Sequence, residues 1–568
     1  MTEEKIIETK VCKHCQISFD ITDKDLEFYD KISPVFNWVK YSIPSPTLCP
    51  DCRQQRRLSF RNERNLYKRK CGLCHKGIVS TYSPNKKYNV YCNECWNSDK
   101  WDEFAYWREY NWNKDFFEQF SDLIKLCPLL SIDHKKININ CNFSNFIWNC
   151  KDCYLSYSIA ECENVNYSYA LEFSKNSFDC CFVHGWDLCY ENLDCESNFN
   201  SFWLSWCKIC IDARFLFNCE NCKDCFLSSN QKNKQFVLKN KQLSKDEYFD
   251  EIRKIDFWDS KVIDETKKSF NMLKKKSICK FANIINSINV EWDNILNCKD
   301  VINSFSISDS ENIKHGFRIL KESNWVHDCN GLVKGELIYE WSWGWYNGYK
   351  NLFFFTMDSS NNLFYSTLCH NSSNLFGCIW LRNSQYCILN KQYTKQEYET
   401  LVPRIIEHMK KTWEWWEFFP SSISPFGYNE TVANEYYPLK KEEAMSKWFK
   451  WSDYQNPTPQ VTKTIPASKL PDNIQDIPDD ILNWAILCEV TYKPYRIIKQ
   501  ELDFYRKHSL PIPKRHPDQR HLDRMKLRNP RKLYDRLCDK CNKDIKTTYS
   551  PDREEMVYCE ECYNKAVY

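Results

Sequence analysis

One cysteine-rich stretch occurs twice in this sequence, and it constrains the fold more than any other feature. Residues 69–96 read RKCGLCHKGIVSTYSPNKKYNVYCNECW, and residues 536–563 read RLCDKCNKDIKTTYSPDREEMVYCEECY, without a gap. Each copy holds two C-x2-C pairs separated by seventeen residues. Four thiolates at this spacing are typical of a closed, tetrahedral zinc site. The predicted ligands are Cys71, Cys74, Cys92, Cys95, Cys538, Cys541, Cys559 and Cys562.

A third set of C-x2-C pairs lies nearer the N-terminus. Cys12 and Cys15 precede Cys49 and Cys52 by thirty-three intervening residues, and the second pair belongs to the segment PTLCPDCRQQRRLSF. We expect a third metal site here, so the predicted cofactor is Zn2+ at three ions per chain. The C-x2-C knuckle, the aromatic FY segment and the CPDCR knuckle resemble a treble-clef family of zinc-ribbon domains. The resemblance covers about fifty residues and implies zinc binding only.

The duplication also includes this third set, but the second copy is degenerate. Residues 487–507, LCEVTYKPYRIIKQELDFYRK, match residues 11–31, VCKHCQISFDITDKDLEFYDK. The four ligand positions are held in the second copy by Cys488, Thr491, His516 and Gln519. Two potential ligands cannot close a tetrahedral structural site, so we expect no metal there. A cross-braced arrangement would mix C-x2-C pairs from both modules and leave both C-terminal sites incomplete. The C-terminus instead has one complete and one incomplete set, which favours pairing of neighbouring C-x2-C motifs.

Arginines follow the second knuckle of this module at steps of four, four and three residues. This spacing places side chains on one face of a helix. The degenerate copy keeps the arginines while losing the ligands beside them, although Pro530 interrupts the stretch. That retention favours phosphate contact, and a solvated helix face is the alternative. The predicted nucleic-acid-binding residues are Arg53, Arg57, Arg61, Arg64, Arg520, Arg524, Arg528 and Arg531.

Two central regions repeat with a period of twelve residues. In the first, Cys195, Cys207 and Cys219 are twelve apart, and in the second Asp300, Asn312 and Asn324 are. So short a period predicts a β-solenoid of stacked rungs. Recurrence at the structural period favours small, buried cysteines over metal-binding or redox-active ones, an alternative that stays open. Each region is followed by a helix that begins at a capping box, Ser244/Glu247 or Thr394/Glu397.

The predicted fold class is therefore mixed α/β and multidomain, with treble-clef and zinc-ribbon modules at both ends and central β-solenoid arrays of about twelve-residue rungs closed by helices. This combination, over residues 11 to about 400, resembles a family of uncharacterised cysteine-rich zinc-ribbon and repeat proteins of candidate-phyla bacteria, which implies no established activity. The predicted segments are 1–55 treble-clef module, 56–98 zinc ribbon, 99–136 helical connector, 137–243 first array, 244–280 helical segment, 281–393 second array, 394–452 helical segment, 453–486 Pro-rich linker, 487–534 degenerate module and 535–568 zinc ribbon.

Composition limits the partners and the compartment. The net charge is only +3, so no global field draws the chain to nucleic acid or to a membrane surface. The N-terminal residues lack an apolar signal segment, and no run of about eighteen apolar residues occurs. Thirty-three cysteines in such a chain favour reducing conditions. We therefore expect a cytoplasmic protein without a membrane partner.

Sequence motifs give little support for an enzyme. The chain has no Gly-rich phosphate loop, no G-x-S-x-G and no H-E-x-x-H, so no catalytic residue is predicted. The favoured function is a non-enzymatic zinc-binding protein that contacts RNA or DNA through its basic segments. The alternative is a protein-interaction scaffold built on the solenoid. A carbohydrate-active solenoid enzyme is less favoured, with Asp187, Glu191 or Asp194 as acids and tryptophans as sugar-stacking faces.

Overall fold

The chain forms two compact units that interleave along the sequence. The computed structural model describes residues 4–290, 292–299, 301, 304–311, 314, 316–320, 323–324, 329–331, 335–340, 349–353, 359–457 and 459–568. Unit 1 combines Met1–Ile132 with Ala282–Tyr454, and unit 2 combines Asp133–Phe281 with Gln455–Tyr568. The N-terminal module (residues 4–132) therefore belongs with the second array (array 2, residues 282–393). The C-terminal module (residues 455–568) belongs with the first array (array 1, residues 133–243).

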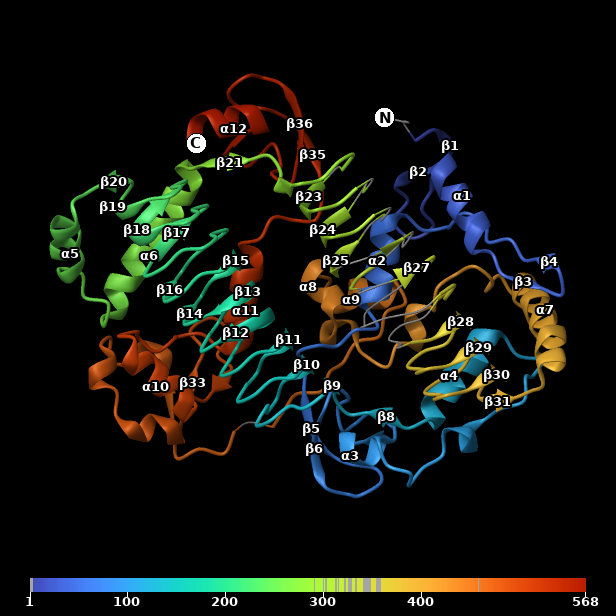
Figure 1. The fold of residues 1–568 in the computed structure, drawn as a ribbon. Coiled ribbons are helices and arrows are strands. Elements are labelled where there is room, and N and C mark those ends of the chain that lie inside the picture. The colour runs from blue at the N-terminus through green and yellow to red at the C-terminus, as the bar shows by residue number, and fades with distance from the viewer. Residues whose placement is uncertain are drawn as a thin grey trace. The chain divides into compact units, whose positions relative to one another are not determined.

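The N-terminal module of unit 1 consists of short hairpins and helices, labelled in Figure 1. Its elements are β1 (Ile6–Val11), β2 (Ser18–Thr22), α1 (Asp23–Ile32), β3 (Val35–Phe36), β4 (Val39–Lys40), α2 (Pro50–Leu58), β5 (Tyr67–Lys70), β6 (Gly77–Ser80), β7 (Val90–Tyr91), α3 (Asn93–Trp96), a 3-10 turn (Glu103–Tyr106), α4 (Phe116–Leu126) and β8 (Leu129–Leu130).

Array 2 and the helices after it complete unit 1. Its strands are β22 (Ile284–Ile285), β23 (Trp292–Leu296), β24 (Ser304–Ser308), β25 (Phe317–Leu320), β26 (Ser323–Asn324), β27 (Gly335–Glu336), β28 (Asn361–Phe364), β29 (Ser373–Phe376), β30 (Gln385–Ile388) and β31 (Lys391–Gln392). The helices are α7 (Lys395–Lys411), α8 (Val432–Tyr436) and α9 (Lys441–Ser446), with 3-10 turns at Ser421–Ile423 and Tyr428–Glu430. Of the predicted repeat positions, 300 and 312 lie outside the described residues.

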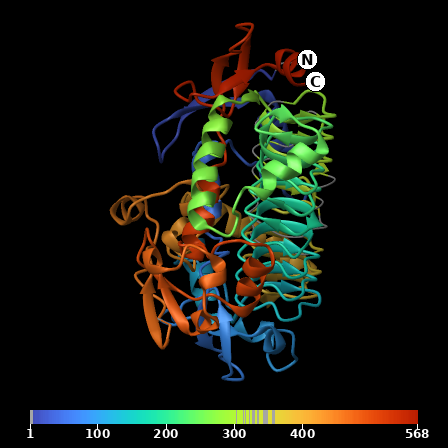
Figure 2. The same cartoon turned by 90° about the vertical axis from the view of Figure 1, so that its left-hand side faces the viewer.

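Array 1 begins unit 2, and its strands are stacked one above another. They are β9 (His134–Lys135), β10 (Asn145–Trp148), β11 (Tyr157–Ala160), β12 (Tyr169–Lys175), β13 (Cys181–Asp187), β14 (Cys189–Tyr190), β15 (Leu193–Glu196), β16 (Ser201–Phe202), β17 (Arg214–Phe217), β18 (Lys223–Ser229), β19 (Gln235–Leu238) and β20 (Lys241–Gln242). Helices α5 (Lys245–Arg253) and α6 (Ser260–Lys276) and strand β21 (Ile278–Lys280) follow. Figure 2 shows the teal and green strands stacked, with the long green helix α6 running along them.

The C-terminal module completes unit 2. Its elements are β32 (Lys463–Pro466), 3-10 turns at Ala467–Lys469, Ile474–Asp476 and Asp479–Asn483, β33 (Trp484–Leu487), β34 (Pro494–Tyr495), α10 (Lys499–Lys507), α11 (Pro517–Lys526), β35 (Tyr534–Leu537), β36 (Asp544–Thr547), β37 (Met556–Tyr558) and α12 (Glu560–Val567). Residues 453–486 were expected to form a linker, but part of this segment packs against the rest of unit 2. Ile474, Ile477 and Ile481 are buried, because the proline-rich stretch packs its isoleucines into the core of unit 2.

Most successive strands of the arrays pair in parallel at an offset of twelve residues. The offset is thirteen between β9 and β10 and eleven between β22 and β23, and the last strand of each array pairs antiparallel. Ile147 pairs with Ile159 in array 1, and Leu363 pairs with Leu375 in array 2. The offset agrees with the predicted rung length. The predicted capping boxes at the starts of α5 and α7 are also confirmed, since Ser244 and Thr394 exchange hydrogen bonds with Glu247 and Glu397.

Each rung of array 1 turns at a corner every three residues. A residue with positive φ recurs at every third position from Asn140 to Lys239, and Gly185 is the only glycine among them. Twelve residues per rung therefore give four corners. A corner N–H donates to the rung before it, as from Asn164 to the Lys151 carbonyl at 2.9 Å. The residue preceding a corner donates to the rung after it, as from Lys151 to the Cys162 carbonyl at 2.9 Å. This three-residue period was not predicted from the sequence.

Cysteine, serine and asparagine share one buried position in the rungs. At this position the side chain donates to the carbonyl nine residues ahead, as from Cys207 to Leu216 at 3.4 Å and from Asn192 to Ser201 at 3.0 Å. Serine and asparagine also accept from the N–H twelve residues ahead, as Asn192 does from Leu204 at 2.9 Å. The rung cysteines are therefore buried hydrogen-bonding residues, and the chain holds no disulfide among its thirty-three free thiols.

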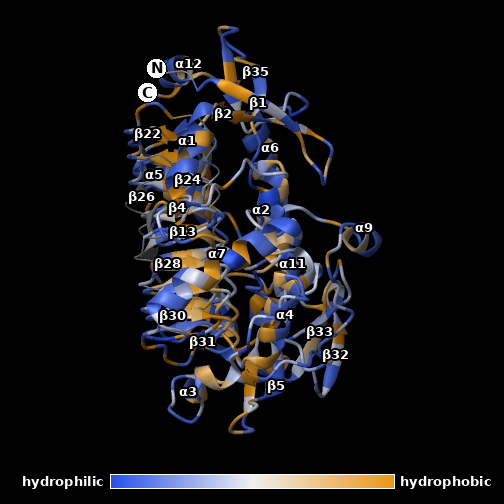
Figure 3. Cartoon of the chain, turned by 90° about the vertical axis from the view of Figure 1, so that its right-hand side faces the viewer, coloured by the Kyte–Doolittle hydropathy of each residue, from blue (hydrophilic) through white to orange (hydrophobic). Residues whose placement is uncertain are grey.

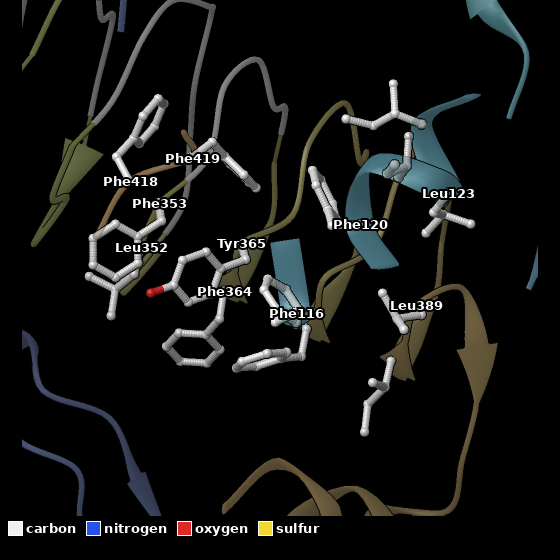
Figure 4. Packing of buried hydrophobic residues seen from close by; sticks show 14 of the residues in the cluster. Phe116, Phe120, Leu123, Leu352, Phe353, Phe364, Tyr365, Leu389, Phe418 and Phe419 are labelled. Atoms are coloured by element: carbon white, nitrogen blue, oxygen red, sulfur yellow. The ribbon is translucent and has the colours of Figure 1, made fainter. Parts of the chain in front are cut away.

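Aromatic packing joins the N-terminal module to array 2 within unit 1. Phe116 of α4 contacts Tyr365 and Phe376 at ring-centroid distances of 5.2 and 5.4 Å. Figure 4 shows Phe116, Phe120 and other α4 side chains facing this layer of the array. Within the described ranges, every helix is too short or too polar to span a bilayer.

We predict that Asn192→Ala destabilises unit 2 by about 1–3 kcal/mol, because the buried Leu204 N–H loses its acceptor. Asn192→Ser should cost less, since Ser201 already accepts from the Ala213 N–H at 3.4 Å in the same rung position. Urea denaturation of the two variants measures the difference. Equal stability of the alanine and wild-type proteins would contradict the role of this hydrogen bond.

Candidate metal centres

The structure brings the twelve predicted ligand cysteines together as three groups of four. In each group the four Sγ atoms all lie within 4.8 Å of one another. The groups are Cys12, Cys15, Cys49 and Cys52; Cys71, Cys74, Cys92 and Cys95; and Cys538, Cys541, Cys559 and Cys562. No further group of this kind occurs among the described residues.

Distances between neighbouring thiols fit a tetrahedral thiolate site. With Zn–S bonds of about 2.3 Å, tetrahedral geometry places sulfur atoms about 3.8 Å apart. The Sγ atoms of Cys15 and Cys49 are 3.5 Å apart, and those of Cys74 and Cys92 are 3.9 Å apart. Cys541 and Cys559 are separated by 3.7 Å. The donor set and its spacing therefore suit a zinc ion in each group.

The first cysteine of each group lies in the same tight knuckle. The Cys71 N–H donates to the Lys76 carbonyl at 2.9 Å, and the Cys71 carbonyl accepts from the His75 N–H at 3.0 Å. His75 has a φ of 60°, a left-handed conformation that closes the turn. Gln16 and Asn542 occupy the same place in the other two knuckles, with φ of 62° and 57°. The same backbone turn thus places the first ligand of all three groups.

Backbone N–H groups favour thiolate at the first cysteine of both ribbons. Burial raises the pKa of the Cys71 thiol, but N–H donors from Cys74 and Cys92 lower the pKa to about 6. Burial likewise raises the pKa of Cys538, and N–H donors that include Cys559 lower it to about 6. Since thiolate is the form that binds metal, both sites are prepared for a cation.

The degenerate copy keeps the knuckle without the ligands. Tyr492, with a φ of 56°, closes a turn in which its N–H donates to the Cys488 carbonyl at 3.0 Å. His516 Nδ1 accepts from the Asp518 N–H at 3.1 Å and caps α11, while the Gln519 amide donates to Asp523 at 2.7 Å. The side chains at the ligand positions are therefore engaged in helix capping and surface hydrogen bonds.

In unit 2, Arg520 and Arg524, which were predicted to bind phosphate, do not lie on an exposed surface. Arg520 and Arg524 of α11 are buried and donate to Asp179 of array 1 at 2.5 and 2.8 Å. Asp179 itself is 0 % exposed. Arg520 also reaches Glu501 of α10 at 3.4 Å. These guanidinium groups bind carboxylates inside unit 2 and do not form an exposed face.

The last two arginines of the second copy are partly buried. Arg528 makes a bidentate pair with Asp194 of array 1, at 2.9 and 3.0 Å, and Arg531 follows it beyond the end of α11. Glu191, a second acid suggested for the carbohydrate alternative, pairs with Lys267 at 3.1 Å. Both Asp194 and Glu191 are therefore engaged in ion pairs within unit 2.

The basic helix of unit 1 is buried in a comparable way. Helix α2 is hydrophilic, mainly blue in Figure 3, yet Arg53, Arg57 and Arg61 are each at most 4 % exposed. Arg57 lies 4.0 Å from Glu340 of array 2, and Arg61 pairs with Glu63. Arg64 is 3.9 Å from Glu435. The expected solvent-facing helix surface is therefore an internal one in unit 1 as well.

Sequence reasoning missed the acids that these arginines contact. Arg56, outside the predicted set, donates to Glu340 at 3.0 Å and to Glu417 at 2.8 Å. Burial raises the pKa of the Glu417 carboxyl, but the Arg56 guanidinium lowers it below its usual value. Glu340 follows Tyr339 in array 2, as Asp179 follows Phe178 in array 1. The sequence feature shared by these two acids is an aromatic residue directly before each of them.

We predict that Asp179→Asn destabilises the protein by about 3–5 kcal/mol, because two buried arginines lose their shared carboxylate. Glu163→Gln is the matched control, since Glu163 pairs with exposed Lys151 and Lys175 on the same array. The control should change stability by less than about 1 kcal/mol. Chemical denaturation followed by tryptophan fluorescence measures both. Equal effects of the two substitutions would reject a special role for the buried pair.

No protein-family model matches this chain, and no curated protein matches it either. The likeness to treble-clef and zinc-ribbon modules therefore rests on the spacing of the cysteines and on the three four-cysteine groups.

Proposed function

We propose that the protein is a non-enzymatic, zinc-dependent scaffold that binds other proteins. The observation that carries the proposal is the set of three four-cysteine groups, each with the spacing of a structural zinc site. A closed site of four protein ligands leaves no open position for substrate, so the metal serves the fold. The β-solenoid predicted for the arrays supplies long, regular faces of the kind that repeat proteins use for binding.

The burial of the arginines supports a structural role over phosphate contact. A phosphate-binding side chain has to reach solvent, whereas Arg57 is 0 % and Arg520 is 5 % exposed. Their carboxylate partners lie in the arrays, so the pairs attach each module to its array. This role also accounts for the survival of the arginines in a copy that has lost its metal ligands.

Exposed tryptophans of unit 1 support a protein partner. Trp38 is 99 % exposed at the tip of the β3–β4 hairpin, and Trp413 and Trp448 are also largely exposed. Tryptophan is among the residues most enriched at the energetic centres of protein interfaces. Large aromatic side chains that contribute nothing to the core of unit 1 fit a surface used in binding.

We predict three zinc ions per chain by elemental analysis. Cys541→Ser should lower the count to two, whereas Cys225→Ser should leave three, because Cys225 is a rung cysteine that donates to backbone carbonyls. Chelation of the metal should unfold the modules, since the small modules gain folding free energy from the metal. A count of four or more, or unchanged modules after chelation, would contradict these assignments.

Binding to nucleic acid is the competing function, and its salt dependence decides between the two. A protein that neutralises several phosphates loses affinity steeply as salt rises. We expect no saturable binding of a single-stranded RNA or a duplex DNA at about 50 mM salt, measured by fluorescence anisotropy. Tight binding whose logarithmic salt slope amounts to several units would reject the scaffold proposal and restore the nucleic-acid one.

A further inference from the structure

A cavity of about 470 Å3 lies within unit 2, between array 1, helix α6 and the start of α11. Its walls include Trp203 of array 1, Phe270 and Lys274 of α6, and Ile512 of the loop before α11. Cavities of this size hold small-molecule ligands in many proteins, usually with mostly apolar walls and a few polar groups. None of the metal groups contributes to it.

Most cations in the cavity wall already have carboxylate partners. Lys267 pairs with Glu191 at 3.1 Å, and Arg515 pairs with Glu489 and Asp523 at 2.7 Å. Arg520 and Arg524 share Asp179, as described above. These pairs neutralise the groups involved and leave them little charge to offer a ligand.

Lys274, like the exposed Lys526, differs from these paired cations of the wall. In the part of the chain that the structure describes, its ammonium has no carboxylate within ion-pair distance, and it lies 4.9 Å from the centroid of the Phe270 ring. Burial lowers the pKa of Lys274 to about 8. A partly buried ammonium without a counter-ion is costly, and an anion beside it would offset that cost.

Trp203, another residue of the cavity wall, has a buried donor without an acceptor. It is 5 % exposed, and its indole Nε1–H is buried with no hydrogen-bond partner among the described residues. Buried indole N–H groups usually have a partner, so this one is an exception that calls for an acceptor. Its ring stacks on Phe215 at 4.5 Å, and Phe215 contacts Phe270 at 5.7 Å. Trp203 and Phe270 therefore both line the cavity, and Phe215 packs between them.

We propose that this cavity binds a small aromatic anion, with a carboxylate or phosphate group beside Lys274 and an aromatic body against the wall of Trp203 and Phe270. The anion supplies the counter-charge that Lys274 lacks. The apolar wall supplies the contact area for the ring. The site is independent of the zinc ions and of the arginine pairs.

The test uses the full-length, zinc-loaded protein and isothermal titration calorimetry. The probes are 1-naphthoate, 1-naphthyl phosphate and the cation 1-naphthylmethylammonium, which share one ring system. We expect at least one anion to bind at a single site with a Kd below about 1 mM, and the cation to bind much more weakly. Tighter binding of the naphthoate or of the naphthyl phosphate identifies the carboxylate or the phosphate as the preferred group.

Three variants locate the binding site. Lys274→Met should weaken anion binding about tenfold or more, and Trp203→Phe should weaken it less, because the smaller ring keeps part of the aromatic wall. Lys268→Met, on the exposed side of the same helix, is the control and should bind as the wild type does.

Absence of anion binding, binding of the cation as tight as that of the anions, or wild-type affinity in Lys274→Met would overturn the proposal. Zinc content and a thermal melt show whether each variant is folded. Should Lys274→Met fail to fold, unchanged affinity in Lys274→Gln overturns the proposal, and a measured loss supports it.

Discussion

Hydrogen bonding between rungs is the constraint on which array 1 depends. A left-handed residue at every third position costs non-glycine residues about 1–2 kcal/mol each. Hydrogen bonds to the neighbouring rungs offset this strain. The corner N–H, as at Asn164, donates to the rung before, and the N–H of the residue preceding a corner, as at Lys151, donates to the rung after. A single rung has no such partners. The array is therefore stable only as a stack, in the way that repeat proteins derive stability from neighbouring units.

Buried arginine–carboxylate pairs fix where the modules meet the arrays. A buried ion pair contributes little net stability, but burying either charge without its partner would be strongly destabilising. The Arg520, Arg524 and Asp179 cluster therefore specifies one position of α11 on array 1. In unit 1, Arg56 and Arg57 meet Glu340 on array 2 in a similar manner. The four-cysteine groups lie within the modules, whereas the arginine pairs connect each module to its array.

Local patterns were predictable from the sequence, and contacts over long distances were not. The four-cysteine groups follow from C-x2-C spacing, because the ligands of each knuckle lie within a few residues of each other. The twelve-residue offset follows from the spacing of cysteines in array 1. The corner conformation was hidden, since bulky residues such as Phe143 and Leu155 occupy corners that usually favour glycine or asparagine. The helical spacing of the arginines holds for the first two of each set, since Arg61 and Arg528 already lie beyond the ends of α2 and α11. Asp179 lies 341 residues before Arg520, and the aromatic residue beside this acid does not identify so distant a partner.

The interleaved order of the two units also sets the order in which the chain can fold during synthesis. Unit 1 has all its segments once residue 454 has left the ribosome. Array 1 is made earlier, yet its partner segment, Gln455–Tyr568, is made last. Domains emerging from the ribosome generally fold as units, and apolar surface exposed in the meantime promotes aggregation. Array 1 therefore lacks its partner segment, and Phe178 and Asp179 stay uncovered, while more than a hundred and fifty residues of unit 1 are synthesised after it.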